Sequence, residues 1–297
     1  MYTEGHLNCG VGFILWFQQF SPTLDLPFTA LTLIGGEVFL VLFVLLLYWC
    51  IDRRMGIRLG VLFLLSGYLN TLAKAIADQP RPFEYDTRVK KLFMASGGGF
   101  PSGHTQNTVV IWGYVASRSQ SAELWLTAGL LMVLVPLSRV YLGLHFPTDL
   151  LGGYLFGALT LLLYCWLEPI AEAWLRRRRL ALQLGLGFTL PALLILAFPR
   201  NDKNGIIAAS TLMGMGIGFA LERHWVNFST EGIMWKRALR FLLGGSILLA
   251  LVLGLRATFD GLEPEPLFRF VRYGLVGLWG AFGAPLAFVW LGLCKKE

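Results

Sequence analysis

Charged residues are scarce in this chain. Only 14% of its 297 residues are Asp, Glu, Lys or Arg, whereas a typical soluble domain has about 25%. Hydrophobic residues make up 56% of the sequence, so a soluble protein of this composition would expose a very large apolar surface. The scarcity of charge therefore excludes an ordinary soluble domain and predicts a protein that crosses the membrane several times.

Cysteine is also sparse, and its spacing indicates no site. The four cysteines, Cys9, Cys50, Cys165 and Cys294, form no CxxC pair, so neither a zinc site nor a disulfide framework is expected. The opening MYTEGHLNCG lacks the basic residues that begin a cleaved signal peptide. We therefore expect no cleaved signal peptide here. Basic loops at a membrane face explain the net charge of +7, so no nucleic-acid partner is expected.

Apolar runs of about 20 residues are candidate transmembrane helices. They lie at 27–50, 58–77, 102–118, 121–141, 147–168, 180–199, 204–222, 236–256 and 270–293. We therefore expect an all-α, polytopic membrane bundle of about nine transmembrane helices. The run at 102–118 is the shortest and the most polar of them.

An apolar patch at 11–20 precedes these runs and is interrupted by two glutamines. One interpretation is a short helix that lies in the membrane interface, anchored by Trp16 and Phe17. The other is a helix that packs into the core against later spans.

The distribution of Lys and Arg predicts the orientation. Loops that follow the odd-numbered spans carry more of these residues than the loops that follow the even-numbered spans. The densest clusters, Arg176–Arg179 and Lys236–Arg237 with Arg240, belong to the first set. We therefore expect the N-terminus outside and the C-terminus in the cytoplasm. The end of span two, the start of span three, the end of span four and the start of span five then face the non-cytoplasmic side.

Unusual polar residues occupy those four helix ends. Span two ends in KAIADQPRP, which contains Lys74 and Arg81; taken singly, each is explained by snorkelling or by an ordinary loop charge. Span three begins with PSGH, and a helix N-terminus with open N–H groups can bind an anion. Ser102 alone is explained as an N-cap, but a cap does not account for His104.

The stretch SRVYLGLHFPTD joins spans four and five and supplies Ser138, Arg139, His145 and Asp149. Because His145 and Asp149 are four residues apart, the carboxylate can reach one imidazole nitrogen and leave the other as a nucleophile or base. A structural His–Asp cap is the alternative. Taken together, the basic residues, two histidines, a carboxylate and an open helix N-terminus indicate phosphoryl transfer through a phosphohistidine, or binding of a phosphate-like anion.

These residues resemble the three motifs of the type-2 phosphatidic acid phosphatase superfamily, K-x6-RP, PSGH and SR-x5-H-x3-D. The matching positions are Lys74, Arg81–Pro82, Pro101–His104, Ser138–Arg139, His145 and Asp149. The resemblance implies a helical phosphatase core of about five to six helices.

The resemblance also implies roles for the motif residues. His145 is expected to attack phosphorus, Asp149 to orient His145, and His104 to protonate the leaving oxygen and then to activate water. The implied phosphate ligands are Lys74, Arg81, Ser102, Gly103 and Arg139. Because cationic side chains take the stabilising role, no metal and no cofactor are expected. The implied enzyme is a metal-independent phosphoric monoester hydrolase.

The chain is longer than the plainest members of the superfamily. We expect an N-terminal interfacial segment at 1–26, a phosphatase core at 27–179 and a C-terminal transmembrane extension at 180–297. Nine spans and the stretch SRVYLGLHFP resemble the glucose-6-phosphatase branch, whereas Asp149 follows the lipid-phosphatase pattern.

The C-terminal part carries few polar signals of its own. We interpret Glu222–Trp225 as an interfacial anchor at a cytoplasmic helix end. The spacing of Gly214, Gly216 and Gly218 favours close packing of two helices.

The sequence therefore predicts an integral membrane phosphatase that acts on a lipid phosphate or diphosphate from the bilayer, with its active site on the non-cytoplasmic face. The alternatives are a glucose-6-phosphatase-like hydrolase of a small soluble phosphoester and a non-catalytic lipid transporter or scramblase. Lys74, near a helix end, favours the lipid because it places the phosphate close to the interface. Side chains that would instead recognise sugar hydroxyls are Glu84, Tyr85, Asp86, Gln106 and Asn107.

Overall fold

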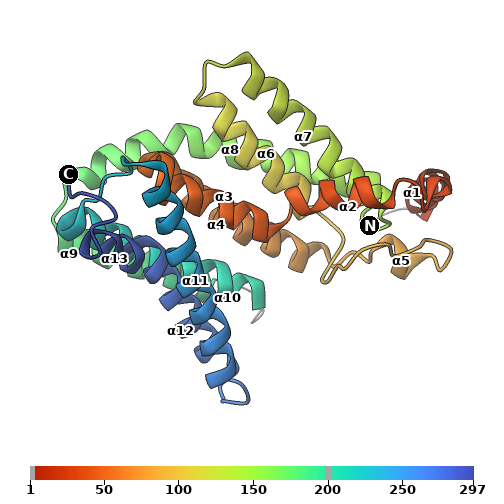
Figure 1. The fold of residues 1–297 in the computed structure, drawn as a ribbon. Coiled ribbons are helices and arrows are strands. Elements are labelled where there is room, and N and C mark those ends of the chain that lie inside the picture. Colours follow the sequence, from red (N-terminus) through yellow and green to blue (C-terminus); the bar gives the residue numbers. More distant parts are fainter. Residues whose placement is uncertain (1–3, 198–202) are drawn as a thin grey trace. The chain divides into compact units, whose positions relative to one another are not determined.

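Helices joined by turns and loops make up the part of the chain that the computed structural model describes, residues 4–197 and 203–297 (Figure 1). Within those ranges, β-structure is limited to an isolated antiparallel bridge between Phe228 and Lys296. The chain divides into two compact units. The first holds Met1–Leu40 and Leu69–Trp166, and the second holds Val41–Tyr68 and Leu167–Glu297. The prediction of an all-α fold is confirmed.

Six helical segments in the described residues are long and apolar enough to cross a membrane. They are Arg53–Tyr85, Ala122–Tyr141, Pro147–Arg176, Lys203–Val226, Met234–Thr258 and Glu265–Trp290. Asp25–Ile34 and Glu37–Ile51 add a seventh if this pair, bent by 46°, is counted as one span. The expected number of about nine transmembrane helices is therefore not confirmed.

Two of the expected spans are helices that are too short to be counted among these membrane-crossing segments. The α6 helix (Gly103–Ser117) has 15 residues and α9 (Leu180–Leu196) has 17, while the end of the run predicted at 180–199 and Arg200 lie outside the described residues. In α6, the polar residues from Thr105 to Thr108 are buried in the protein. A helix enclosed by protein can carry polar side chains that a helix facing lipid cannot.

The first unit begins with α1 (Glu4–Phe17). Its buried residues Leu7, Val11 and Ile14 follow helical spacing and pack in one cluster with residues that include Phe146. Trp16, on another face, is 52% exposed. The inner face of α1 thus packs into the core, which is one of the two alternatives given for this segment.

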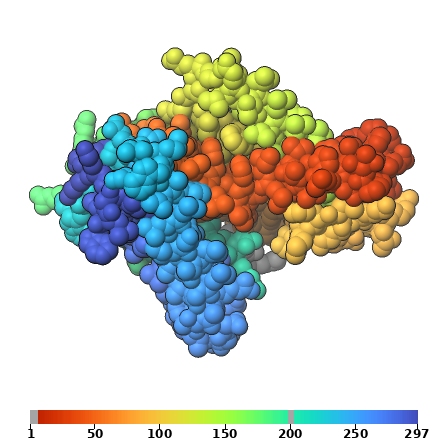
Figure 2. All heavy atoms as spheres, in the orientation of Figure 1, coloured from red at the N-terminus to blue at the C-terminus, as the bar shows by residue number. Residues whose placement is uncertain are grey.

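A long segment between α4 (Arg53–Ala77) and α6 carries parts of two of the predicted site motifs, with Arg81–Pro82 in one and Pro101–Ser102 in the other. The buried side chain of Gln18 fixes this segment, because its amide nitrogen donates to the carbonyls of Lys90 at 2.8 Å and Tyr141 at 3.0 Å, and its oxygen accepts from the Lys90 amide. Figure 2 shows the segment lying against the N-terminal helices. An amide that bonds to two distant stretches of backbone holds both in place.

The α7 helix (Ala122–Tyr141) contacts α2 (Asp25–Ile34) near the end of α7. There the rings of Phe28 and Tyr141 stack with centroids 4.5 Å apart, and the Tyr141 hydroxyl donates to Asp25 at 2.5 Å. After α2, Gly35 and Gly36 separate it from α3 (Glu37–Leu46). A Cβ at Gly35 would lie 2.2 Å from the Val135 side chain, so only glycine allows this approach of α2 to α7.

The second unit contains α9, α10 (Lys203–Leu221), α11 (Met234–Thr258), α12 (Glu265–Leu278) and α13 (Ala284–Trp290). A Cβ at Gly214 would lie 2.0 Å from the carbonyl oxygen of Gly274 in α12, and one at Gly216 would lie 3.2 Å from Gly187 in α9. The predicted close packing through these glycines is confirmed.

Two charged residues of the second unit are buried, although the sequence indicated an interfacial anchor at Glu222 and a basic loop residue at Arg240. Glu222 is 0% exposed, pairs with Arg53 at 2.5 Å and accepts from the Phe228 amide at 3.1 Å. Arg240 is also 0% exposed and donates to backbone carbonyls. The sequence interpretation failed here because a charge with enough hydrogen-bond partners can leave the interface for the interior.

Candidate active site

The residues of the three motifs lie in the first unit and come from separate stretches of the chain. Lys74 is in the last turn of α4, and Arg81 precedes the short helix α5 (Pro82–Tyr85). Ser102 is the N-cap of α6, and Arg139 is in the last turn of α7. His145 lies between α7 and α8 (Pro147–Arg176), whose first turn contains Asp149.

The predicted contact between His145 and Asp149 is present. Nδ1 of His145 lies 3.3 Å from Oδ2 of Asp149, and the two side chains are 2% and 0% exposed. The same oxygen accepts from the Phe146 amide at 2.9 Å, while Oδ1 accepts from the side chain of Gln79 at 2.9 Å. The carboxylate thus caps α8 and also holds the imidazole with Nδ1 toward it, which leaves Nε2 for chemistry.

Arg81 lies against that second imidazole nitrogen, with Nη1 3.4 Å from Nε2 of His145. Its guanidinium is held by the carbonyls of Ser96, Gly97 and Leu144 at 2.7 to 2.9 Å. A fixed cation at this distance favours a lone pair on Nε2 rather than a proton.

Burial lowers the pKa of His145 well below the ordinary histidine value, and the cationic side chains of Lys74, Arg139 and Arg81 lower it further. His145 is therefore neutral at pH 7. A neutral imidazole with one nitrogen held by a carboxylate is the form that can act as a nucleophile.

Arg139 is buried with spare hydrogen-bond donors. Nη1 donates to the hydroxyl of Thr32 at 2.6 Å, and Nε has no partner among the described residues. Nearby, the ammonium of Lys74 donates to the carbonyl of Gly98 at 2.6 Å. The motif residues of the site therefore include three cations and one carboxylate. This excess of positive charge favours the binding of an anion.

His104, the second residue of α6, is oriented by the end of α2. Its ring lies beside the backbone of Thr32, and a Cβ at Gly35 would lie 3.3 Å from its Cδ2 atom. Thr32 thus contacts both His104 and Arg139. The hydroxyl of Ser102 accepts from the Thr105 amide and hydroxyl, so the N-cap that was the alternative explanation for this serine is present.

Sequence reasoning missed Thr32 and Gln79. Gln79 lies within the stretch KAIADQPRP, two residues before Arg81, so its position in the motif was a usable signal. Thr32 lies in an apolar run, and the two glycines that follow Ile34 are the only local sign that the helix ends beside a site.

Polar residues considered for sugar recognition are used within the protein. Glu84 accepts from the Arg81 amide at 2.8 Å, and Asp86 pairs with Arg88 at 2.7 Å. Gln106 accepts from the side chain of Asn70 at 2.8 Å. Among the described residues, no three His, Cys, Asp or Glu side chains are grouped so that they could hold a metal ion.

The geometry agrees with a comparison to protein families. Residues 55–171, which contain every motif position, match the family described as PAP2 superfamily. The chain carries a PAP2 superfamily domain. Residues 206–296 match a second description, PAP2 superfamily phosphatase, transmembrane extension. The region that matches the PAP2 superfamily is thus followed by a region that matches the transmembrane extension described for PAP2 phosphatases.

Three relatives of known activity cover different parts of the chain. Sphingosine-1-phosphate phosphatase 1 of Mus musculus is 25% identical over 88% of this chain and 71% of its own length. Phosphatidylglycerophosphatase B of Bacillus subtilis is 28% identical over 47% of this chain and 72% of its own. Glucose-6-phosphatase 3 of Mus musculus is 29% identical over 62% of this chain and 57% of its own. These PAP2 relatives include enzymes named for lipid and for sugar phosphates.

Proposed function

We propose that this PAP2 protein is an integral membrane phosphatase that hydrolyses a lipid phosphate or diphosphate monoester through a phosphohistidine at His145. The observation that carries the proposal is the buried His145–Asp149 pair, in which Nδ1 faces the carboxylate and Nε2 faces Arg81. This is the arrangement of an oriented nucleophile beside a cation that can bind the group under attack.

The reaction proceeds in two steps. The negative charge of the bound phosphate favours the protonated form of His104. Nε2 of His145 forms a bond to phosphorus while the bond from phosphorus to the leaving oxygen breaks, and the imidazolium of His104 donates the proton that this oxygen takes up. His104 then removes a proton from water, the resulting hydroxide attacks phosphorus, and the bond to Nε2 breaks to release inorganic phosphate. Asp149 stabilises the imidazole as it becomes positively charged.

The phosphoryl oxygens are held by donors around this pair. Lys74, Arg81 and Arg139 supply positive charge, and the unpartnered Nε of Arg139 is a donor available to a ligand. Ser102 and the Gly103 amide contribute from the N-terminus of α6, where the helix dipole favours an anion. These side chains take the stabilising role without a metal.

A lipid is the preferred substrate for three reasons. Lys74 lies in the last turn of a membrane-spanning helix, so the phosphate is bound near the membrane interface. Polar side chains that could recognise sugar hydroxyls are instead bonded within the protein, as for Gln106 and Asn70. Sphingosine-1-phosphate phosphatase 1 of Mus musculus aligns over 88% of this chain, whereas glucose-6-phosphatase 3 of Mus musculus aligns over 62%.

The proposal extends to the organisation and orientation of the chain. The phosphatase core is residues 27–179 and the transmembrane extension is 180–297. The cluster Arg176–Arg179 supports a cytoplasmic C-terminus and, with it, an active site on the opposite face.

Phosphate release from purified protein tests this function. A panel of phosphatidate, phosphatidylglycerophosphate, sphingosine phosphate, polyprenyl diphosphate and glucose 6-phosphate is assayed in detergent, with vanadate as inhibitor. We expect a short-chain lipid phosphate to be hydrolysed with a higher kcat/KM than glucose 6-phosphate. The opposite order would overturn the lipid assignment, and release from no substrate would favour a transporter.

A further inference from the structure

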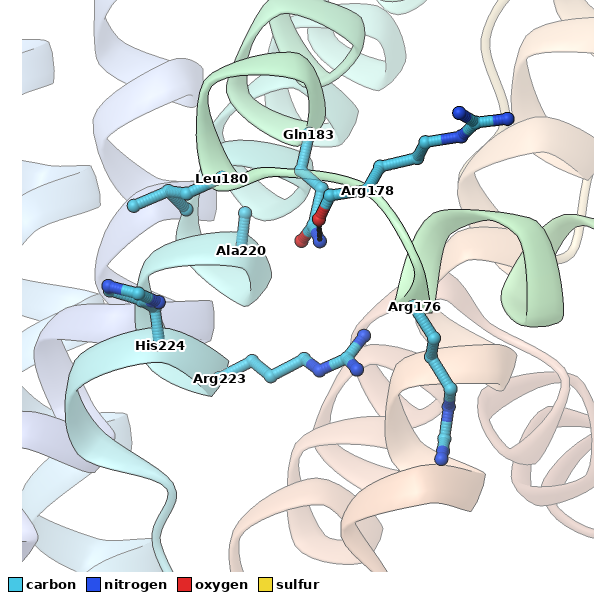
Figure 3. Close-up of a pocket in the computed structure, with 7 residues that line it drawn as sticks. All are labelled: Arg176, Arg178, Leu180, Gln183, Ala220, Arg223 and His224. Carbon is cyan, nitrogen blue, oxygen red and sulfur yellow. Dashed lines mark hydrogen bonds between the residues drawn. The ribbon is translucent and has the colours of Figure 1, made fainter.

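A cavity separate from the active site lies in the second unit, at the ends of three helices. It has a volume of about 190 Å³. Its lining residues are Arg176, Arg178, Leu180, Gln183, Ala220, Arg223 and His224 (Figure 3). They come from the end of α8, the loop and first turn of α9, and the end of α10 with the turn that follows it. All of these residues belong to the second unit, whereas the motif residues belong to the first.

Three side chains of this cavity are placed to bind a ligand. Arg223 extends from the turn after α10 toward Arg176, and the side chain of Gln183 points from α9 into the space above them (Figure 3). Gln183 is held there because its amide nitrogen donates to the carbonyls of Leu175 and Arg178. The amide oxygen of Gln183 can therefore accept from another donor. The guanidinium of Arg178 points away from the cavity and lies over the Trp174 ring, 4.5 Å from its centroid.

The charges around the cavity do not balance. Arg176 pairs with Glu172, but that carboxylate is also bonded to Arg58 at 2.7 Å. Arg223 has no hydrogen bond or ion pair with any described residue, and it experiences the positive charges of Arg176 and Arg53 as well as the negative charge of Glu172. Two guanidinium groups that share little more than a single carboxylate repel each other, and an anion bound between them would remove that cost.

The fitting anion is a phosphate group. Arginine side chains bind phosphate through parallel hydrogen bonds. Trp174 and Trp225, 43% and 55% exposed, flank the cavity residues in sequence and are typical of the membrane interface. Basic pockets between helices at that level bind phospholipid head groups. We propose that this cavity is a second phosphate-binding site, which takes an anionic phospholipid head group or free phosphate and does not participate in hydrolysis.

Paired charge-neutral variants of the full chain test this site. Arg176→Gln/Arg223→Gln removes both facing guanidinium groups. The matched control, Arg177→Gln/Arg179→Gln, removes two arginines of the same loop that do not line the cavity, so both proteins have the same net charge. Binding of phosphatidylglycerol to detergent-purified protein is measured by native mass spectrometry. We expect about tenfold weaker binding in the first variant, and a change below about twofold in the control.

A parallel titration with inorganic phosphate distinguishes the two sources. The cavity variant and its control both keep the active-site residues. Phosphate bound at the active site therefore contributes equally to both titrations and does not affect their difference. A cavity-dependent loss for phosphatidylglycerol alone assigns the site to a lipid head group, and a loss for inorganic phosphate alone assigns it to the free anion. Equal losses in both variants, or no loss with either ligand, would overturn the proposal.

A more conservative variant keeps the test usable if Arg176→Gln/Arg223→Gln does not fold. Arg176→Lys/Arg223→Lys keeps the charge but removes the forked donors. We expect it to elute as the wild type does and to bind about threefold more weakly. Wild-type affinity in the lysine pair would contradict recognition of phosphate by the guanidinium groups.

Discussion

Arg139 in the first unit and Arg240 in the second are both buried arginines, 3% and 0% exposed, yet they are bonded differently. Arg240 donates to four backbone carbonyls, those of Trp49, Ser229, Thr230 and Glu231. Arg139 has one hydrogen bond among the described residues, to the hydroxyl of Thr32. Nε has no partner among the described residues in either side chain, so the two differ only at their Nη groups. Burial alone therefore does not distinguish an arginine bonded to several carbonyls from one with spare donors, whereas the occupancy of the Nη donors does.

Arg81 lies between these two extremes. Three carbonyls hold its guanidinium, as in Arg240, but one of its nitrogens also lies 3.4 Å from His145. A guanidinium has five N–H donors, so it can be fixed by the backbone and still offer a donor to a ligand. The first unit thus combines a rigid cation with one that has free donors.

The largest effect is expected at His145. His145→Ala should lower turnover by about four orders of magnitude or more, because no nucleophile remains, and no phosphoenzyme should form. Acid-labile phosphohistidine and phosphate release are the measurements. His224→Ala, in the second unit, is the control and should keep most of the activity. Phosphoenzyme trapped at another residue would disprove the role of His145.

The next largest effect is expected at the other histidine of the first unit. His104→Ala should lower steady-state turnover by about 10²- to 10⁴-fold, because it removes the general acid and base. With a substrate whose leaving group needs no proton, phosphoenzyme should still accumulate, and rapid quench separates the two steps. Normal turnover of lipid phosphates by this variant would contradict the assignment.

The two buried arginines can be compared directly. Arg139→Gln should lower kcat/KM by about 10²-fold or more, because it removes donors to the phosphoryl group, with little change in Tm. Arg240→Gln should do the opposite: it leaves carbonyls unsatisfied and costs about 1–3 kcal/mol of stability, with near-normal kcat/KM in the folded fraction. Thermal unfolding and initial rates, measured on both variants, test the contrast. Similar profiles for the two would show that donor occupancy does not separate their roles.

A smaller effect is expected at Thr32, which bonds to Arg139. Thr32→Val keeps the shape but removes the hydroxyl, and should lower kcat/KM about tenfold, since a hydrogen bond to a charged group contributes roughly 1.5–3 kcal/mol. Thr32→Ser keeps the hydroxyl and should restore most of the loss. If serine and valine behaved alike, the hydroxyl would have no part in positioning Arg139.

The smallest effect is expected from metal removal. EDTA should change the rate of phosphate release less than about twofold, because cationic side chains neutralise the phosphoryl oxygens. Activity is measured after dialysis against EDTA and again after addition of Mg²⁺. Loss of activity that Mg²⁺ restores would show that Lys74, Arg81 and Arg139 do not suffice.

Much of the fold and the site was predictable because the relevant information is local. The contact between His145 and Asp149 depends on a four-residue separation, and the N-cap role of Ser102 on the residues that follow it. Hydropathy also located the helices, but not how many of them cross the membrane. The burial of the polar residues of α6 and the break between α2 and α3 depend on neighbouring helices. The mean hydropathy of one stretch of sequence contains no information about those neighbours.

The partners of the buried charges were not predictable for the same physical reason. Thr32 and Arg139 are 107 residues apart in the chain, and Gln79 and Asp149 are 70 apart. Arg240 and Trp49 are 191 apart. A side chain alone shows how many hydrogen bonds it can make, but not which distant backbone will come within reach.

The sequence by itself determined the chemistry available to this protein: an apolar chain for the membrane, and histidines, a carboxylate and cations at motif spacings that suit a phosphate. Those properties belong to residue types and to short separations along a helix. Only the tertiary structure decided that Arg240 is bonded to backbone, that Arg139 keeps free donors, and that Arg176 faces Arg223 across a cavity. Hydrogen bonding and electrostatics act over a few ångströms in space, so these outcomes depended on which distant segments the packed helices brought together.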